Sequence, residues 1–187
     1  MSEILDSGER RDFASGAVRD IQEGKGRCDL IPLDVVAKLA GDKEPVDIVL
    51  NSINNFIYTG DEDELLSAIY YFCTCMVGWD IPTAILEVAK HYEDGANKYK
   101  ERNWEKGIPL HCFIDSGVRH YLKYRRGDND EPHNRAFVWN MLGAVWTYEH
   151  KPECIDLPFK DIKQCVSTDT VDADTLRNII ETSKEKM

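Results

Sequence analysis

Carboxylate, imidazole and cationic side chains recur at helical spacing in the middle of this sequence, where they could bind a metal ion and activate water. Glu87, His91 and Asp94 are four and three residues apart, so they fall on one stripe of a helix. Asp115 and Arg119 are four residues apart. Their spacing fits a shared site, and equally a plain ion pair worth a few tenths of a kcal/mol.

An amide inside an apolar run is the second signal. Asn140 lies within AFVWNMLGAVW, seven residues after His133, so both fall on one helix face. A buried amide needs a hydrogen-bond partner, and for Asn140 a site and a neighbouring backbone carbonyl are equal alternatives. His120 is likewise open between a site and a structural role. The other histidines are interpreted as surface residues: His91, His111 and His150.

A glycine-rich stretch, SGAVRDIQEGKGRCDLIP, supplies cations upstream of these groups. Glycine lets backbone N–H groups turn toward an anion, and Lys25 and Arg27 can donate charge-assisted hydrogen bonds to phosphate or carboxylate oxygens. The stretch lacks the Walker spacing GxxxxGK[ST], so it is not interpreted as a P-loop. An exposed turn with solvated cations is the alternative to a ligand site.

These residue types favour metal-assisted chemistry on a phosphorylated small molecule. Carboxylate and amide oxygens suit Mg²⁺ or Mn²⁺, and substrate phosphates often complete the coordination shell of such an ion. A carboxylate or His120 would orient the attacking water. The cations expected to bind phosphate are Lys25, Arg27, Lys98 and Arg119.

Helices must position these residues, because apolar residues recur mainly at helical spacing. This spacing predicts helices over 33–41, on either side of Thr59-Gly60, up to about Lys100, over 110–124 and 132–148, and in the closing stretch DTLRNIIETSKEK. Residues 2–13 are expected to form a frayed or extended arm. VDIVL is the only strand candidate, and one strand makes no sheet. The predicted fold class is therefore all-α.

Composition limits the partners of this chain of 187 residues, for which we expect one helical domain over 1–150 and a tail over 151–187. The net charge of −11 argues against binding of duplex nucleic acid, which demands a basic face. No apolar run approaches the roughly 18 residues of a membrane span, so we expect a cytoplasmic protein without a membrane partner. The six cysteines form no CxxC pair, and Cys73 and Cys75 are interpreted as buried thiols.

Four motifs follow one another along the chain. GAVRD with GKGRCDLIP occupies 16–20 and 24–32, GANKYKERNWEKG occupies 95–107, and DSGVRHYLKYRRGDNDEPH and AFVWN occupy 115–133 and 136–140. In this set, which covers roughly residues 14–40 and 84–148, the chain resembles the dATP/dGTP diphosphohydrolase N-terminal domain family of phages and prophages.

The resemblance implies a MazG-like helical bundle, here with an inserted helical pair over 41–82 and a short C-terminal helix. It also implies Mg²⁺-dependent hydrolysis of a purine deoxynucleoside triphosphate, dGTP or dATP, to the monophosphate and pyrophosphate, in the host cytoplasm if the protein is phage-encoded. The ExxE…ExxD pattern of typical MazG enzymes is not present as such. A nucleotide-binding module or sponge without turnover therefore stays an alternative. The apolar tract YYFCTCMVGW keeps a homo-oligomer or a partner-binding protein open.

Each candidate residue has an expected role in this nucleotide site. Asp115 and His120 are assigned to catalysis, and the predicted metal ligands are Glu87, Asp115, Asp130 and Glu131. Besides the four phosphate-binding cations, the residues expected to shape the base or sugar pocket are Asn103, Trp104 and Asn140. All of these roles require side chains that are distant in sequence to converge on one pocket.

Overall fold

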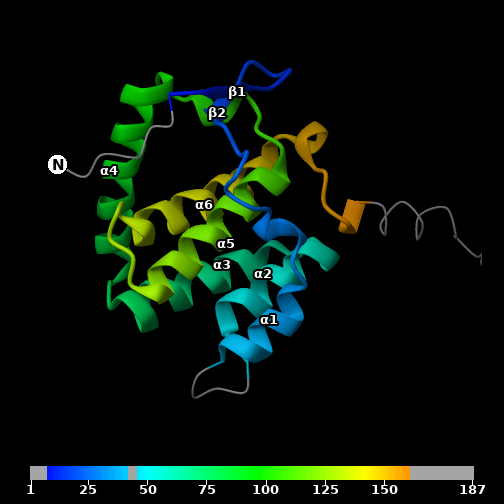
Figure 1. Cartoon of the computed structure of the whole chain (residues 1–187), viewed down its shortest axis with the longest axis vertical. Helices are drawn as coiled ribbons and strands as arrows, with labels where there is room; N and C mark the ends of the chain where they lie inside the picture. Colours follow the sequence, from blue (N-terminus) through cyan, green and yellow to red (C-terminus); the bar gives the residue numbers. More distant parts are fainter. Residues whose placement is uncertain (1–7, 42–45, 161–187) are drawn as a thin grey trace, which may run out of the picture.

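A computed structural model describes residues 8–41 and 46–160, and this part of the chain is mainly helical, so the all-α prediction is confirmed (Figure 1). Its α-helices are α1 (Leu33–Ala40), α2 (Ile48–Thr59), α3 (Glu62–Tyr71), α4 (Ile81–Tyr99), α5 (Leu110–Arg126) and α6 (His133–His150). Short helical turns are η1 (Cys28–Leu30), η2 (Phe72–Val77), η3 (Asn103–Lys106) and η4 (Pro152–Cys154). The predicted helices within the described ranges are confirmed to within a few residues at each end.

The antiparallel pair α5 and α6 forms the centre of the molecule, with α4 on one side and α1 to α3 on the other (Figure 1). Two glycines let the pair approach closely. A Cβ atom on Gly117 would lie 2.2 Å from Cε of Met141, and one on Gly143 would lie 2.4 Å from Cε1 of Phe113. Real Cβ atoms do not approach neighbours so closely, so a neighbour would have to move at either position. The flexible end of Met141 can shift, whereas the rigid ring of Phe113 makes the requirement for glycine strict at Gly143.

We therefore expect Gly143→Ala to lower the free energy of unfolding by about 1–3 kcal/mol, because the new methyl group must displace the buried ring of Phe113. Gly95→Ala on α4 is the matched control, because nothing lies within 4 Å of its Cβ position. Alanine is the better helix former by about 1 kcal/mol, so this variant should be slightly stabilised. Urea denaturation of both variants measures the contrast, and equal stabilities would contradict the close packing of α5 and α6.

VDIVL, the only strand candidate in the sequence, forms no strand: α2 begins within it at Ile48. Asp47 is the N-cap of α2, and its Oδ1 accepts a hydrogen bond from the backbone N–H of Leu50 at 3.0 Å. Its Oδ2 accepts from the hydroxyl of Tyr121 and pairs with Arg125, both on α5. Asp47 thus starts α2 and ties it to the central pair.

A two-stranded antiparallel sheet, β1 (Arg10–Asp12) and β2 (Val18–Asp20), is the main feature that the sequence did not predict. Arg10 pairs with Asp20 and Arg11 with Arg19 in its register. The predicted extended arm over 2–13 contains β1, and its first residues lie outside the described ranges. The sheet lies at one end of α4 (Figure 1), where Asp20 of β2 pairs with Lys98 of α4.

Three further predictions concern two cysteines, the C-terminal helix and membrane spans. Cys73 is buried as predicted, but Cys75 is exposed. The predicted C-terminal helix lies outside the described residues. Within those residues no single helix is long and apolar enough to cross a membrane. The helical segments Glu62–Val77 and Ile81–Tyr99 reach the length and apolar composition of a membrane span only when they are counted as a pair. The chain bends by 100° between the two segments.

Candidate functional site

A cavity of about 710 Å³ lies between the sheet, the glycine-rich loop, α4, η3, α5 and α6. Ligand sites in proteins are commonly cavities of about 300–1,000 Å³. Residues from all four sequence motifs line it, and among the predicted site residues these are Lys25, Asn103, Trp104, Asp115, Arg119, His120, Glu131 and Asn140. The expected convergence of distant side chains is thus observed for these eight residues.

Asp115 and Arg119 hold the glycine-rich loop against α5. The buried carboxylate of Asp115 accepts hydrogen bonds from the backbone N–H of Cys28 at 2.6 Å and from Nε2 of Gln22 at 2.8 Å, and it pairs with Arg119. Arg119 also donates to the backbone carbonyls of Lys25 and Gly26, at 3.2 and 3.0 Å. The predicted ion pair is therefore present as part of a clamp, and both Asp115 oxygens already have partners.

The loop brings only one of its two predicted cations to the cavity. Lys25 lies at the rim, with Nζ 4.0 Å from Oδ2 of Asp20, and burial lowers the pKa of its ammonium group. Arg27 is exposed and pairs with Asp29 through two hydrogen bonds. It lies outside the cavity lining.

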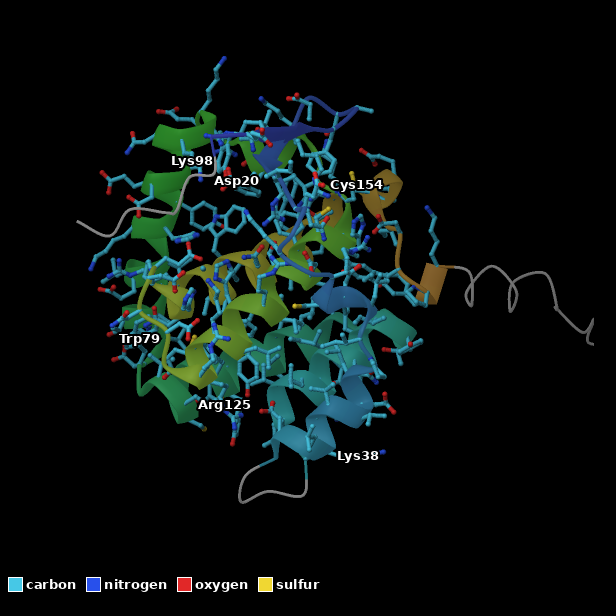
Figure 2. The ribbon with its side chains drawn as sticks, viewed as in Figure 1. Asp20, Lys38, Trp79, Lys98, Arg125 and Cys154 are labelled. Carbon is cyan, nitrogen blue, oxygen red and sulfur yellow. The ribbon has the colours of Figure 1, made fainter. Side chains whose placement is uncertain are left out.

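Lys98 lies behind the cavity wall. Its Nζ is 2.8 Å from Oδ2 of Asp20, and only 8% of its side chain is exposed (Figure 2). Asp20, which does line the cavity, also accepts from Arg10 at 2.9 Å. Lys98 thus acts on the cavity through Asp20, whose carboxylate it shares with Arg10.

Arg19 is a cavity residue to which the sequence analysis gave no role, although it belongs to the GAVRD motif. Its guanidinium lies over the rings of Phe113 and Trp139, at 5.2 and 5.6 Å from their centroids. One nitrogen, Nη2, donates to Oδ1 of Asn140 at 2.9 Å. The other, Nη1, is buried without a hydrogen-bond partner among the described residues. Burial lowers the pKa of Arg19, but a guanidinium stays protonated at neutral pH.

Asn140 bonds a neighbouring backbone carbonyl, which was one of the two alternatives, and it also lines the cavity, so its role in a site stays a prediction. Its amide nitrogen donates to the backbone carbonyl of Ala136 at 2.7 Å, while its oxygen accepts from Arg19. Asn140 is buried and lines the cavity. It therefore anchors the guanidinium of Arg19 to the centre of α6.

Asn103 and Trp104 form a wall of the cavity. The amide of Asn103 bonds the backbone of Val18 at both ends: Val18 donates to Oδ1 at 3.0 Å and accepts from Nδ2 at 2.8 Å. Trp104 packs edge-on against Tyr92 and Trp146, with centroid distances of 5.7 and 4.9 Å. Asn103 thus fixes β2 to η3, and Trp104 contributes an aromatic surface.

His91 is buried and lines the cavity, so its interpretation as a surface residue is wrong. Its Nδ1 is buried without a hydrogen-bond partner among the described residues. Burial, reinforced by nearby Arg135, lowers the pKa of His91 to about 4, so the imidazole is neutral at pH 7. Glu87, one turn earlier on α4, instead pairs with Arg135 and Lys90 and lies outside the cavity lining.

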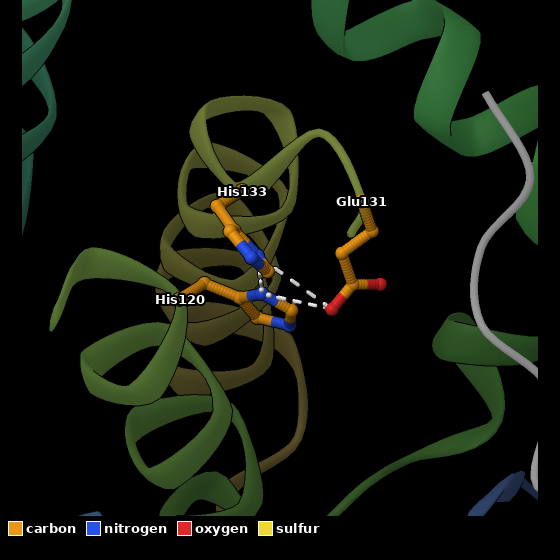
Figure 3. A group of neighbouring side chains, drawn as sticks. All are labelled: His120, Glu131 and His133. Carbon is orange, nitrogen blue, oxygen red and sulfur yellow. Dashed lines mark hydrogen bonds and ion pairs between the residues drawn. The ribbon is translucent and has the colours of Figure 1, made fainter. Parts of the chain in front are cut away.

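Three groups that could bind a metal ion gather where α5 meets the start of α6 (Figure 3). Nδ1 of His120 lies 3.0 Å from Nδ1 of His133 and 3.4 Å from Oε1 of Glu131. Oε1 of Glu131 lies 3.6 Å from Nδ1 of His133. Burial lowers the pKa of His120 well below its usual value, and the neighbouring His133 adds to this effect. Sequence spacing had paired His133 with Asn140 without assigning it to a metal.

The four predicted metal ligands are not brought together. Glu131 belongs to the cluster with the two histidines, and Asp130 lies next to it, accepting from Nε2 of His133 at 2.7 Å and pairing with Lys123. Within the described ranges two sets of neighbouring side chains could hold an ion, and neither set contains Glu87 or Asp115. Their carboxylates are neutralised by arginine instead.

Comparison with known proteins supports the predicted family. Residues 73–156 match the family model described as dATP/dGTP diphosphohydrolase, N-terminal. The matched segment contains the last three motifs and the cluster of His120, Glu131 and His133, while the glycine-rich loop precedes it. No curated protein and no solved structure matches the chain.

Proposed function

From the premise that residues 73–156 belong to the dATP/dGTP diphosphohydrolase N-terminal family, we propose that this protein hydrolyses a purine deoxynucleoside triphosphate. The products would be the deoxynucleoside monophosphate and pyrophosphate, and the reaction would use a divalent metal ion. In this reaction a water oxygen forms a bond to the α-phosphorus, the bond from that phosphorus to the bridging oxygen breaks, and the pyrophosphate leaves with that oxygen.

The buried guanidinium of Arg19 is the observation that carries this proposal. A charge without a carboxylate partner is costly to bury, and Arg19 bonds only to the neutral amide of Asn140 within the described residues. A ligand with anionic or acceptor oxygens would satisfy Nη1. Lys25 at the rim adds a second cation to the same cavity.

The aromatic lining supports a ligand that also carries a base. Tyr92, Tyr99, Trp104 and Trp139 line the cavity beside these cations. A nucleobase stacks well on aromatic rings, whereas inorganic phosphate or a sugar phosphate would leave this surface unused. A nucleotide therefore matches both parts of the lining.

The residues also fit the divalent ion that the family implies. His120, Glu131 and His133 would hold it, and two of the three line the cavity. Such an ion neutralises charge on the transferring phosphate and lowers the pKa of bound water. Asp115 and Arg119 would keep the glycine-rich loop, with Lys25, in place against the polyphosphate.

Binding without turnover is the second candidate. It is favoured by the state of Asp115, whose two oxygens are occupied by the loop and by Arg119, so it adds no free carboxylate to the metal cluster. A module of this kind would be stabilised by nucleotide and release no product.

A panel of nucleotides separates the two candidates. The four deoxynucleoside triphosphates are incubated with the protein and Mg²⁺ or Mn²⁺, and pyrophosphate, phosphate and monophosphate are quantified beside the melting temperature. We expect one pyrophosphate per monophosphate from dGTP or dATP. Melting shifts without pyrophosphate would replace hydrolysis by binding, and neither response to any nucleotide would remove both candidates.

A homo-oligomer also remains a proposal. Leu66 and Tyr70 on α3 and Ile85 and Leu86 on α4 are large apolar side chains that are exposed in the single chain. Light scattering of the purified protein would test it directly.

A further inference from the structure

We infer that His120, His133 and Glu131 form a binding site for a divalent transition-metal ion, of the class of Mn²⁺, Co²⁺ and Zn²⁺, and that this site discriminates against Mg²⁺. The role of this ion in catalysis rests on the proposed function. The three ligands, and the binding of the ion to them, do not depend on hydrolysis of a nucleotide.

The spacing of the three ligand atoms fits one central ion. The distances between Nδ1 of His120, Nδ1 of His133 and Oε1 of Glu131 are 3.0, 3.4 and 3.6 Å. A circle through these atoms has a radius of about 1.9 Å, just below the metal–ligand distances of about 2.0–2.2 Å that imidazole and carboxylate ligands prefer. An ion slightly above the plane of the three atoms would therefore reach all of them without a rearrangement of the backbone.

The hydrogen bond of His133 to Asp130 directs the lone pair of His133 toward this position. Its Nε2 lies 2.7 Å from Oδ1 of Asp130, which can only accept when ionised, so the proton of a neutral imidazole belongs on Nε2. Nδ1 is then left unprotonated and faces His120 and Glu131 (Figure 3). Lys123 pairs with the same carboxylate at 2.8 Å and holds it in place. Carboxylate, histidine and metal in this order are a common arrangement in metal sites.

The cluster is closed on one side and open on the other. His133 is 2% exposed and lies outside the cavity lining. His120 and Glu131 line the cavity. Three protein ligands with positions left for water or substrate oxygens are typical of catalytic metal sites, and an ion held here would be reached from the cavity side.

The ligand types decide which ions bind. Mg²⁺ takes oxygen ligands almost exclusively and keeps several waters, whereas two imidazole nitrogens with one carboxylate suit transition metals. A second group, Asp128, Asp130 and His133, is richer in oxygen. Its carboxylates are already neutralised by Arg126 and Lys123, so it competes poorly for a cation.

Cobalt absorption spectroscopy tests the site without nucleotide. Untagged full-length protein is stripped with a chelator and titrated with Co²⁺, whose visible d–d bands report imidazole and carboxylate ligands. We expect one equivalent to bind, Zn²⁺ to displace it, and a hundredfold excess of Mg²⁺ to leave the spectrum unchanged. Displacement by that excess of Mg²⁺ would overturn the discrimination.

Variants locate the ion. His133→Ala and Glu131→Gln should each weaken Co²⁺ binding at least about tenfold, and Asp130→Asn, outside the ligand set, by about 10-fold to 100-fold. His150→Ala is the matched control, because His150 is an exposed histidine at the end of α6, and this variant should bind Co²⁺ like the natural chain.

Circular dichroism verifies folding, and a cluster variant that does not fold is replaced by His120→Ala. Unchanged Co²⁺ binding in the folded cluster variants, or a thiolate-to-cobalt charge-transfer band from a cysteine site, would overturn the inference. Normal Co²⁺ binding without pyrophosphate release would remove the proposed hydrolysis and leave this site intact.

Discussion

The Arg19→Met variant is expected to lose nucleotide affinity by about 100-fold or more, which corresponds to about 2.7 kcal/mol. Arg19 provides a buried charge and an unpaired N–H group in the cavity, and methionine removes both. Methionine can still pack against the rings of Phe113 and Trp139. The affinity loss would be measured by calorimetric titration of a purine deoxynucleoside triphosphate whose α–β bridge is not hydrolysable.

The same substitution should leave the stability of the unliganded protein nearly unchanged, because removal of a buried charge offsets the lost hydrogen bond to Asn140. Nucleotide affinity should therefore fall without a loss of stability. If Arg19 had only a structural role, its replacement would lower both together. Arg27→Met is the matched control, since Arg27 lies in the same stretch but is exposed and outside the cavity lining. Equal affinity losses for the two variants, or an unaltered affinity for Arg19→Met, would contradict the assignment of Arg19 to the ligand.

The Asp115→Asn variant is expected to lose both stability and hydrolysis. Asparagine keeps the shape of aspartate, but it cannot accept from both Cys28 and Gln22 while neutralising Arg119. Breaking a buried ion pair costs about 3–5 kcal/mol, and the glycine-rich loop loses its attachment to α5. Urea denaturation and pyrophosphate release would measure the two losses.

Asp115 should have no part in metal binding. Folded Asp115→Asn protein is therefore expected to bind Co²⁺ like the natural chain, whereas a ligand role would weaken this binding together with activity. Asp128→Asn is the control for stability, because its pair with Arg126 is exposed and such pairs contribute little. An Asp115→Asn variant as stable as the Asp128→Asn variant would show that the clamp on the loop is not important.

Local sequence patterns were sufficient for most helices of this fold. The helices α4, α5 and α6 have apolar residues at regular spacing and clear ends, such as Gly127 after α5, which has a φ of +85°. VDIVL stayed a strand candidate because so short a run of apolar and acidic residues fits both the helix and the strand period. The N-cap hydrogen bond accepted by Asp47 stabilises the helical conformation of this segment.

The strands and the burial of His91 could not be predicted in this way. β1 and β2 are three residues each, RRD and VRD, without apolar alternation. They are held by contacts from elsewhere, including the bond between Asn103 and Val18. His91 is buried because α4 packs against α6, where the His91 ring lies beside Trp139. The sequence of α4 alone carries no sign of this contact.

The sequence predicted which segments meet at the cavity better than it predicted the bonding partners of each side chain. The four motifs indicated which segments meet, and eight of the predicted residues do line the cavity. The role of each side chain depends on its hydrogen-bond and ion-pair partners, which the spacing of residues in the sequence does not reveal. Glu87 shares a helical stripe with His91 but pairs with Arg135 from α6. Arg19 gained importance only because no carboxylate among the described residues hydrogen-bonds its guanidinium.

Hydrogen–deuterium exchange with the non-hydrolysable nucleotide tests most directly that the motifs form one nucleotide site. Bound nucleotide with Co²⁺ or Mn²⁺ should slow exchange in three separate segments: the β2 strand with the glycine-rich loop up to Cys28, the α4 end with η3, and the start of α6 with Glu131. Exchange in α1 and α2, far from the cavity lining, should not change. Protection confined to one segment, or found in α1 and α2 instead, would contradict a shared site.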